Sequence, residues 1–271
     1  MRFLRSKWRK LKRFFTHRQK PQPSVDGLSG GIVPSIEEQS EDEIIRRNTG
    51  AHRIYKRVAF VQAHDDSASG CASYPVAVPA DFPDEKTGNS LKRREYDISG
   101  YVLGKAKRMI DVESFSMAVE LFNRTGRGIR GVGRQLEKFK PDLVISGHKN
   151  SVGHKSDVEG REILLRKMYK GTFAEKEARR MLRLMEHFIG PSPLRGDKGI
   201  RWTDRKKAGD YNLDVYDDSG CKVVMLLEED FIGKATPTAK QLMEGEGLNN
   251  NAKAIAYFCL GYDVIGGELV L

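Results

Sequence analysis

FKPDLVISGHKNS, residues 139–151, is the stretch of this chain that decides its fold. Proline cannot continue a helix, so Pro141 predicts that a preceding helix ends here. The next four apolar-rich residues, LVIS at 143–146, form a short run typical of a strand buried inside a sheet. His148 comes almost directly after that run. The stretch therefore predicts a buried strand that carries a potential ligand at its carboxyl end.

Two other stretches repeat this arrangement. RVAFVQA at 57–63 is a β-rich apolar run followed by His64, and KVVMLL at 222–227 is followed by Glu228. In parallel sheets the carboxyl ends of the strands meet at one edge, where ligands bind. We therefore expect these polar side chains to gather at the same edge.

Amphipathic helices are predicted between the strands, and a further strand is predicted at 162–165. Apolar residues recur at helical spacing in five stretches, at 91–110, 115–122, 129–139, 174–188 and 252–259. Apolar strands alternating with such helices indicate an α/β fold, with a mostly parallel sheet and helices on both faces.

The net charge of +10 at pH 7 belongs to the N-terminal part of the chain. Residues 1–20 hold nine Lys or Arg and no acid, so the rest of the chain is nearly neutral. Residues 21–54 are rich in Pro, Ser, Gly and acids, a composition typical of a flexible linker. We therefore expect a basic tail at 1–20, a linker at 21–54 and one folded domain at 55–271.

The basic tail is predicted to be amphipathic. At helical spacing its apolar side chains share one face, namely Leu4, Trp8, Leu11 and Phe15. Such a segment suits an anionic membrane or an anionic wall polymer, although a solvated arm fits the same composition. Nucleic acid is the less favoured partner, because nucleic-acid-binding domains usually carry their basic patch on the fold.

The three strand-end residues, together with Glu95 at the start of a predicted helix, have the chemistry of a metal site. Catalytic zinc commonly takes three ligands from His and Asp or Glu and keeps one position open. Taken singly, each residue has another interpretation: a histidine at a strand end often makes loop hydrogen bonds, and a glutamate at a helix start is favoured by the helix dipole. Spacing alone leaves both interpretations open.

Five segments, in the same order along the chain, resemble the zinc-dependent N-acetylmuramoyl-L-alanine amidases of type 3, which cleave peptidoglycan. The first resembles the metal-binding loop of that family, whose pattern is roughly GHGGxDxGA, and the last its L-x-E-x-G-F stretch. The segments are VAFVQAHDDSASGCAS (58–73), EYDISGYVLGKAKRMI (95–110), FKPDLVISGHKNS (139–151), VEGREILL (158–165) and VVMLLEEDFIGKATPTAKQL (223–242).

The resemblance implies a phosphorylase/hydrolase-like α/β fold and a role for each matching residue. His64, Glu95 and His148 would hold Zn²⁺, and Glu228 would be the catalytic base. Asn150 and Glu162 would lie along the groove that binds the peptide. The implied substrate is the amide bond between N-acetylmuramic acid and L-alanine in peptidoglycan.

The chain also departs from the family pattern. Asp65 and Asp66 replace the two glycines after the first histidine, which adds charge and removes backbone freedom. The insertion between His64 and Glu95 contains Asp84 and Glu85, which are rival ligands to Glu95. These changes leave open a zinc amidohydrolase of another substrate, or a catalytically degenerate protein with a structural or binding role.

The tail does not resemble a secretory signal, because no continuous apolar run follows its positive charges. We therefore expect synthesis in the cytoplasm. Peptidoglycan lies outside the cytoplasm, so one hypothesis is a phage endolysin or a virion-associated protein that reaches the cell wall by another route.

Overall fold

The structure is a computed structural model that describes residues 55–65, 95–114, 116–150, 159–204, 211–221, 223–230, 237–243 and 245–271. The predicted tail at 1–20 and linker at 21–54 lie outside these residues. No helix among them is both long and apolar enough to cross a membrane.

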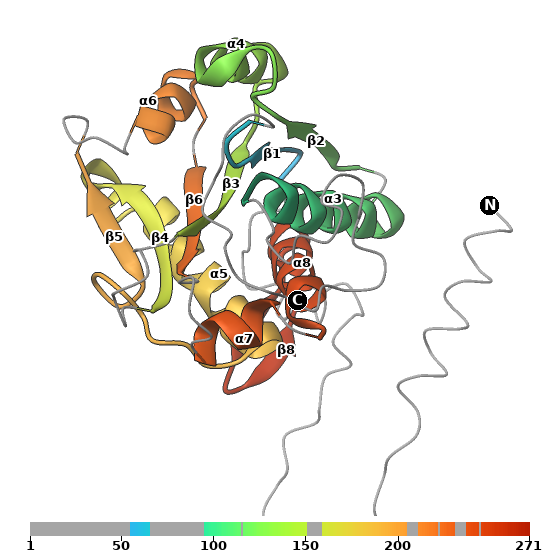
Figure 1. Ribbon diagram of the computed structural model, residues 1–271, viewed down its shortest axis with the longest axis vertical. Coiled ribbons are helices and arrows are strands. Elements are labelled where there is room, and N and C mark those ends of the chain that lie inside the picture. Colours follow the sequence, from blue (N-terminus) through green and yellow to red (C-terminus); the bar gives the residue numbers. More distant parts are fainter. Residues whose placement is uncertain are drawn as a thin grey trace, which may run out of the picture. The chain divides into compact units, whose positions relative to one another are not determined.

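A six-stranded sheet forms the centre of the domain (Figure 1). Its strand order is β2 (Ala118–Phe122), β1 (Arg57–Gln62), β3 (Leu143–Asn150), β6 (Val223–Asp230), β4 (Gly160–Arg166) and β5 (Ile200–Thr203). The first four strands are parallel, whereas β4 runs antiparallel to β6 and parallel to β5. The predicted α/β fold with a mostly parallel sheet is thus confirmed.

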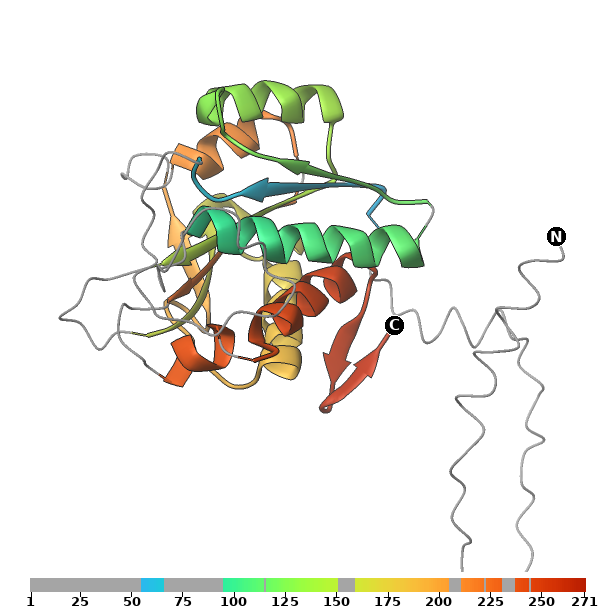
Figure 2. The same ribbon diagram turned by 45° about the vertical axis from the view of Figure 1, so that its right-hand side comes forward.

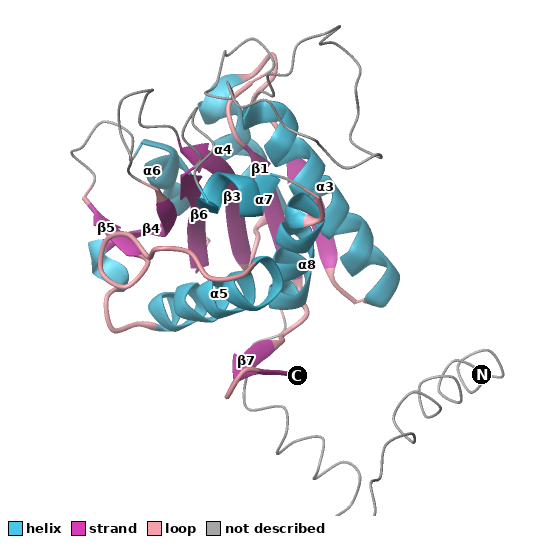
Figure 3. Ribbon diagram, turned by 60° about the horizontal axis from the view of Figure 1, so that its bottom comes forward, coloured by secondary structure: helices cyan, strands magenta, loops and turns pink. Residues whose placement is uncertain are grey.

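Helices cover both faces of the sheet, as predicted. One face carries α3 (Glu95–Glu113), α5 (Phe173–Ile189) and α8 (Gly247–Cys259), with the short α7 (Pro237–Met243) packed against α8. The other face carries α4 (Gly128–Phe139) and α6 (Tyr211–Asp218). Figure 2 shows α3 and α4 on opposite sides of β1 and β2, and Figure 3 shows α5 and α8 lying across the sheet.

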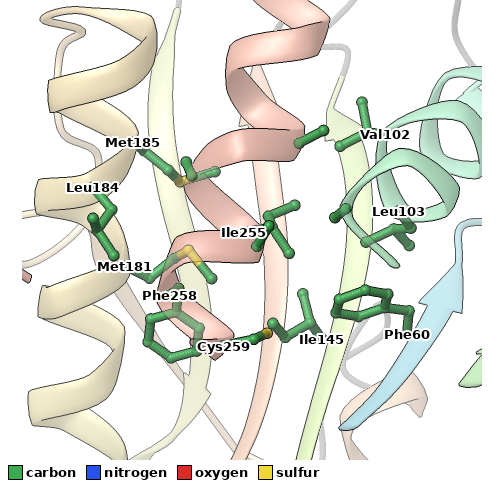
Figure 4. Packing of buried hydrophobic residues seen from close by; sticks show 14 of the residues in the cluster. Phe60, Val102, Leu103, Ile145, Met181, Leu184, Met185, Ile255, Phe258 and Cys259 are labelled. Carbon is green, nitrogen blue, oxygen red and sulfur yellow. The ribbon is translucent and has the colours of Figure 1, made fainter. Parts of the chain in front are cut away.

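The larger core lies between the sheet and α3, α5 and α8. In Figure 4, α8 lies between α5 and α3, with Ile255 directed into the space between these helices. Along β1, Val58 and Phe60 join this core, whereas Ala59 and Val61 join the smaller core beneath α4 and α6. This alternation explains why the 57–63 run is apolar at nearly every position: both faces of β1 are buried.

The join between α4 and β3 fixes the position of the strand that carries His148. Helix α4 ends at Phe139, and Lys140 takes a left-handed conformation (φ 52°) while its N–H donates to Leu136 O at 2.7 Å. The Asp142 carboxylate then accepts hydrogen bonds from the backbone N–H groups of Lys56 and Arg57, at 3.0 and 3.1 Å. These bonds tie the start of β3 to the start of β1, so the two strands remain in register.

One predicted helix is wrong. Residues 118–122 form β2, an edge strand that pairs with β1, and Ala118 N–H donates to Lys56 O at 2.8 Å. The apolar residues of 115–122 fit helical spacing, but a segment this short has no decisive period. Main-chain pairing with β1 determines its conformation.

Several small elements were not predicted at all. They are β5, α6, α7, the single turn of 3₁₀ helix η1 (Lys167–Tyr169), and a hairpin of β7 (Asp263–Ile265) and β8 (Glu268–Val270). Each is short and carries few apolar residues, so its sequence has little periodicity.

A buried ion pair connects α5 to the start of β1 and the end of α8. Arg180 donates to both carboxylate oxygens of Glu177, at 3.0 and 2.5 Å, and its guanidinium stacks over the Phe258 ring at 4.0 Å. Tyr55 OH donates to Glu177 Oε2 at 2.5 Å, and Arg180 also donates to Phe258 O at 2.9 Å. Removal of either charge would therefore leave the other buried without its partner.

Substitution Glu177→Ala should lower the free energy of unfolding by about 3–5 kcal/mol, because it leaves the buried Arg180 charge without its ion-pair partner. The matched control is Asp111→Ala, which removes an exposed ion pair with Lys107 on α3 and should cost about 0.3–0.5 kcal/mol. Urea unfolding of both variants measures the difference. Equal losses would show that the Glu177–Arg180 pair has no special role in stability.

Candidate metal centre

His64 lies two residues beyond β1, in an unusual backbone conformation. Its φ of 57° is left-handed, a region that residues other than glycine seldom adopt. The preceding Ala63 N–H donates to Ser99 Oγ at 3.0 Å, and Ser99 Oγ donates to Gly147 O at 2.7 Å. A single serine of α3 therefore joins the end of β1 to the end of β3 and turns the chain at His64 toward α3.

Glu95 is the first residue of α3, and its carboxylate is buried. Gln62 Nε2 donates to Tyr96 O at 2.7 Å, which holds the start of this helix against the end of β1. The Glu95 carboxylate accepts a hydrogen bond from the backbone N–H of Lys149 at 2.8 Å.

The Glu95 carboxylate lies between two imidazoles. His148 Nδ1 is 2.8 Å from Glu95 Oε1, and His64 Nε2 is 3.0 Å from Glu95 Oε2. The two rings meet edge to face with their centroids 5.5 Å apart. His148 is buried, whereas the His64 side chain keeps 35% of its surface exposed. The centre is therefore open to solvent on the side of His64.

This arrangement shifts the pKa of each member. Burial on its own would raise the pKa of Glu95, but the hydrogen bonds with His148 and His64 outweigh it and lower the pKa to about 2. The hydrogen bond with Glu95 raises the pKa of His64 above its ordinary value. Burial lowers the pKa of His148, despite the same carboxylate beside it. A lowered pKa favours the neutral form of His148, and a neutral imidazole has a nitrogen lone pair that a metal could use.

The residues fit a metal ion by two observations. His148 Nε2 is buried and has no hydrogen-bond partner among the described residues, which is uncommon for a buried nitrogen. One ligand atom from each of His64, Glu95 and His148 can be chosen so that all three lie within 4.8 Å of one another. Ligands that share one zinc ion lie within about 4.4 Å, twice the metal–ligand bond, so the group needs to contract only slightly.

The other predicted site residues lie along the same strands. Glu228 on β6 is in register with His148 on β3 and with Glu162 on β4, so these three residues form one row across the sheet. Asn150 is the last residue of β3, in register with Asp230. His148 and Glu228 were expected to follow their strands. Both residues lie inside strands instead, because β3 and β6 each extend two residues beyond them.

Glu162 is buried and neutralised by arginines. Its Oε1 accepts hydrogen bonds from Arg195 at 3.4 Å and from Arg201 at 3.3 Å. A role in substrate binding remains a prediction for Glu162 and Asn150. The rival ligands Asp84 and Glu85 lie outside the described residues.

The comparisons with known proteins concern the fold. No protein-family model matches the chain, and no curated protein sequence matches it significantly. Solved structures do match. The chain has the fold of the N-acetylmuramoyl-L-alanine amidases. This confirms the fold that the five ordered segments implied, with β3 and β6 at its centre.

Three amidase structures illustrate the likeness. The N-acetylmuramoyl-L-alanine amidase from Clostridium difficile 630 is 14% identical with a TM-score of 0.54, over 77% of this chain and 96% of that one. Ami1 from Mycobacterium smegmatis is 15% identical with a TM-score of 0.51, over 77% and 97%. AmiC2 of Nostoc punctiforme is 17% identical with a TM-score of 0.51, over 75% and 94%.

Some residues of the centre were not found from the sequence. Ser99 and Gln62 have no motif that distinguishes them from other polar residues, and the Lys149 N–H is a main-chain group. Arg124 follows β2, and its positive charge opposes protonation of both histidines, adding to the effect of burial at His148 and outweighed at His64 by the hydrogen bond with Glu95. Its position after a strand was a usable signal, but that strand had been predicted as a helix.

In the metal-free protein, Glu95 should make stability depend on pH. Its folded pKa of about 2 lies below the ordinary value of 4.5, so the unfolded chain binds the proton more readily. The stabilisation is present above about pH 4.5 and is lost as the pH falls toward 2. Urea unfolding at several pH values should therefore show a steeper acid loss in the wild type than in Glu95→Gln.

The control for this experiment is Glu113→Gln, at the exposed opposite end of the same helix. It should keep the acid dependence of the wild type. If Glu95→Gln has the same slope as the wild type between pH 5 and 2, the carboxylate is not held ionised by the two imidazoles.

Proposed function

We propose that this protein is a zinc-dependent hydrolase that cleaves the N-acetylmuramoyl-L-alanine amide bond of peptidoglycan. The observation that carries the proposal is the His64–Glu95–His148 group at the rim of the central sheet. Its support is the fold shared with solved N-acetylmuramoyl-L-alanine amidases. Peptidoglycan is then the partner that the centre acts on.

In this proposal His64, Glu95 and His148 hold the ion. Each histidine would contribute one ring nitrogen and Glu95 a carboxylate oxygen, since one ligand atom of each residue lies within 4.8 Å of the others. Bound zinc supplies Lewis acidity, which polarises an amide carbonyl and lowers the pKa of water. The solvent-exposed side at His64 leaves room for a substrate to approach.

Glu228 is proposed as the general base. Its position supports this assignment, because Glu228 lies on β6 directly beside His148 on the neighbouring strand β3, in one row with Glu162. The Glu228 carboxylate would take the proton of the attacking water and give it to the nitrogen of the leaving L-alanine. Glu162 is already paired with Arg195 and Arg201, so we assign it the role of holding these two arginines in place.

A second candidate is a degenerate amidase fold with a structural or binding role. One observation favours it: both oxygens of Glu95 are satisfied by imidazoles, so the group is stable as a hydrogen-bonded cluster without an ion. The unpartnered His148 Nε2 argues against it. Metal content separates the two candidates, because the hydrolase should purify with close to one zinc per chain.

Substitution Glu228→Ala should lower the rate of cell-wall digestion by roughly 10²–10⁴-fold, the usual loss when a general base is removed. Zinc content should remain that of the wild type, because Glu228 is not a proposed ligand. Release of soluble wall fragments and metal analysis on the same samples measure both effects. The control Glu113→Ala should digest walls normally, and a fully active Glu228→Ala protein would exclude the proposed base.

Zinc binding should weaken as the pH decreases. A metal must compete with the proton that His64 takes up, and the raised pKa of His64 makes that competition begin at a higher pH than for an ordinary histidine. Equilibrium dialysis with zinc at a series of pH values should show this loss, and Glu95→Ala should bind little zinc at any pH. Binding that Glu95→Ala leaves unchanged would show that the ion lies elsewhere.

A further inference from the structure

Arg124 lies in the turn that follows β2, beside the proposed centre. Its backbone oxygen accepts hydrogen bonds from the N–H groups of Arg127 at 3.0 Å and Gly128 at 2.8 Å, which fix the turn leading into α4. The neighbouring Thr125 Oγ1 donates to Tyr96 OH at 3.5 Å, and Tyr96 directly follows Glu95. The turn is thus held against the start of α3, where Glu95 binds the two imidazoles.

The Arg124 guanidinium has unused hydrogen-bonding capacity. Its Nη2 donates to Tyr216 OH at 3.4 Å, but its Nε is buried and has no partner among the described residues. No carboxylate in the described part of the chain forms an ion pair with it. A buried donor atom without a partner costs free energy, and a bound ligand that accepts its hydrogen bond would account for it.

Tyr216 orients this guanidinium toward the strands of the centre. The Tyr216 side chain is fully buried on α6, and its hydroxyl lies 3.3 Å from Ser146 Oγ. Ser146 Oγ in turn donates to Val61 O at 3.3 Å. Arg124 is therefore linked through two side chains to β3 and β1, two residues before His148 and three before His64.

The charge of Arg124 acts on the proposed centre. A divalent ion held by one carboxylate and two neutral imidazoles leaves a charge of about +1, and Arg124 adds another positive charge whose effect reaches both histidines. Glu162, in the same region of the sheet, is already neutralised by Arg195 and Arg201. The carboxylate of the proposed base Glu228 offsets one of these positive charges, so an anionic group on the substrate would pair with Arg124 itself and not with the centre as a whole.

We propose that Arg124 binds a carboxylate of the substrate's peptide stem, next to the amide that is cleaved. The inference rests on the proposed function. The planar guanidinium can donate two parallel hydrogen bonds to a carboxylate, a geometry that lysine cannot reproduce. Arg124 is thus a specificity-determining residue, and Tyr216 is the residue that positions it.

The test compares two synthetic N-acetylmuramoyl dipeptides that begin with L-alanine. In one the second residue carries a free carboxylate, and in the other that group is a neutral carboxamide. The wild type should hydrolyse the carboxylate form with a KM roughly tenfold to a hundredfold lower, the effect of one charge-assisted pair. Arg124→Gln should abolish this preference with little change in kcat, and Arg124→Lys should retain only part of it. The control Arg127→Gln, an exposed arginine of the same turn, should keep the preference.

A second measurement does not depend on hydrolysis. Calorimetric titration of the two dipeptides into Glu228→Ala, and into Glu228→Ala combined with Arg124→Gln, reports binding alone. Tighter binding of the carboxylate form that disappears with Arg124→Gln supports the inference, even if no variant hydrolyses either ligand and the proposed function fails.

Two results would overturn the inference. The first is wild-type protein that binds and hydrolyses the two forms equally. The second is Arg124→Gln with an intact preference. Thermal unfolding shows whether Arg124→Gln is folded; if it is not, the comparison between wild type and Arg124→Lys decides, and equal preferences in these two proteins would also overturn the inference.

Discussion

A single buried carboxylate organises the functional edge of this protein. Glu95 accepts hydrogen bonds from two imidazoles and from the Lys149 N–H, so it joins the ends of β1, β3 and α3 at one point. The hydrogen bonds from the two imidazoles outweigh the effect of burial and keep Glu95 ionised.

The rest of the domain holds Glu95 and helix α3 in place. Gln62 and Ser99 fasten α3 to the ends of the strands, and Asp142 ties β3 to β1 at their opposite ends. The larger core then fixes the helix axis, since Ile98, Val102 and Ala106 are buried among residues of the sheet and α8. The two imidazoles therefore reach Glu95 from elements that are hydrogen-bonded to one another.

The sequence predicted the parts of this structure that carry strong periodicity or stand directly beyond a strand. The parallel strands β1, β3 and β6 and the helices α3, α4, α5 and α8 were predicted from their apolar patterns. Predicting that His64, Glu95 and His148 lie together required the family resemblance as well. Glu95 lies 31 residues beyond His64, and the apolar pattern of its helix does not say where that helix packs. β2 was predicted as a helix because a segment of eight residues fits either period, and the pairing that decides it comes from β1. Ser99 was missed because nothing local marks a lone polar residue whose partner is distant in the chain, and Arg124 was missed because the strand before it was predicted as a helix.

The energetics of the edge argue that it is built to bind. A carboxylate and an imidazole buried together cost desolvation free energy, and well-packed apolar residues of similar size commonly stabilise a fold as much or more. The protein does use a buried ion pair for structure elsewhere, between Glu177 and Arg180, and there every charged group finds a partner. At the sheet edge two buried nitrogens, His148 Nε2 and Arg124 Nε, have none among the described residues. Departures of this kind from complete hydrogen bonding tend to occur at functional sites. A purely structural cluster would be more stable if both nitrogens had hydrogen-bond partners or were replaced by apolar groups. Their presence at the edge that also carries the partly exposed His64 therefore favours a site that binds a ligand.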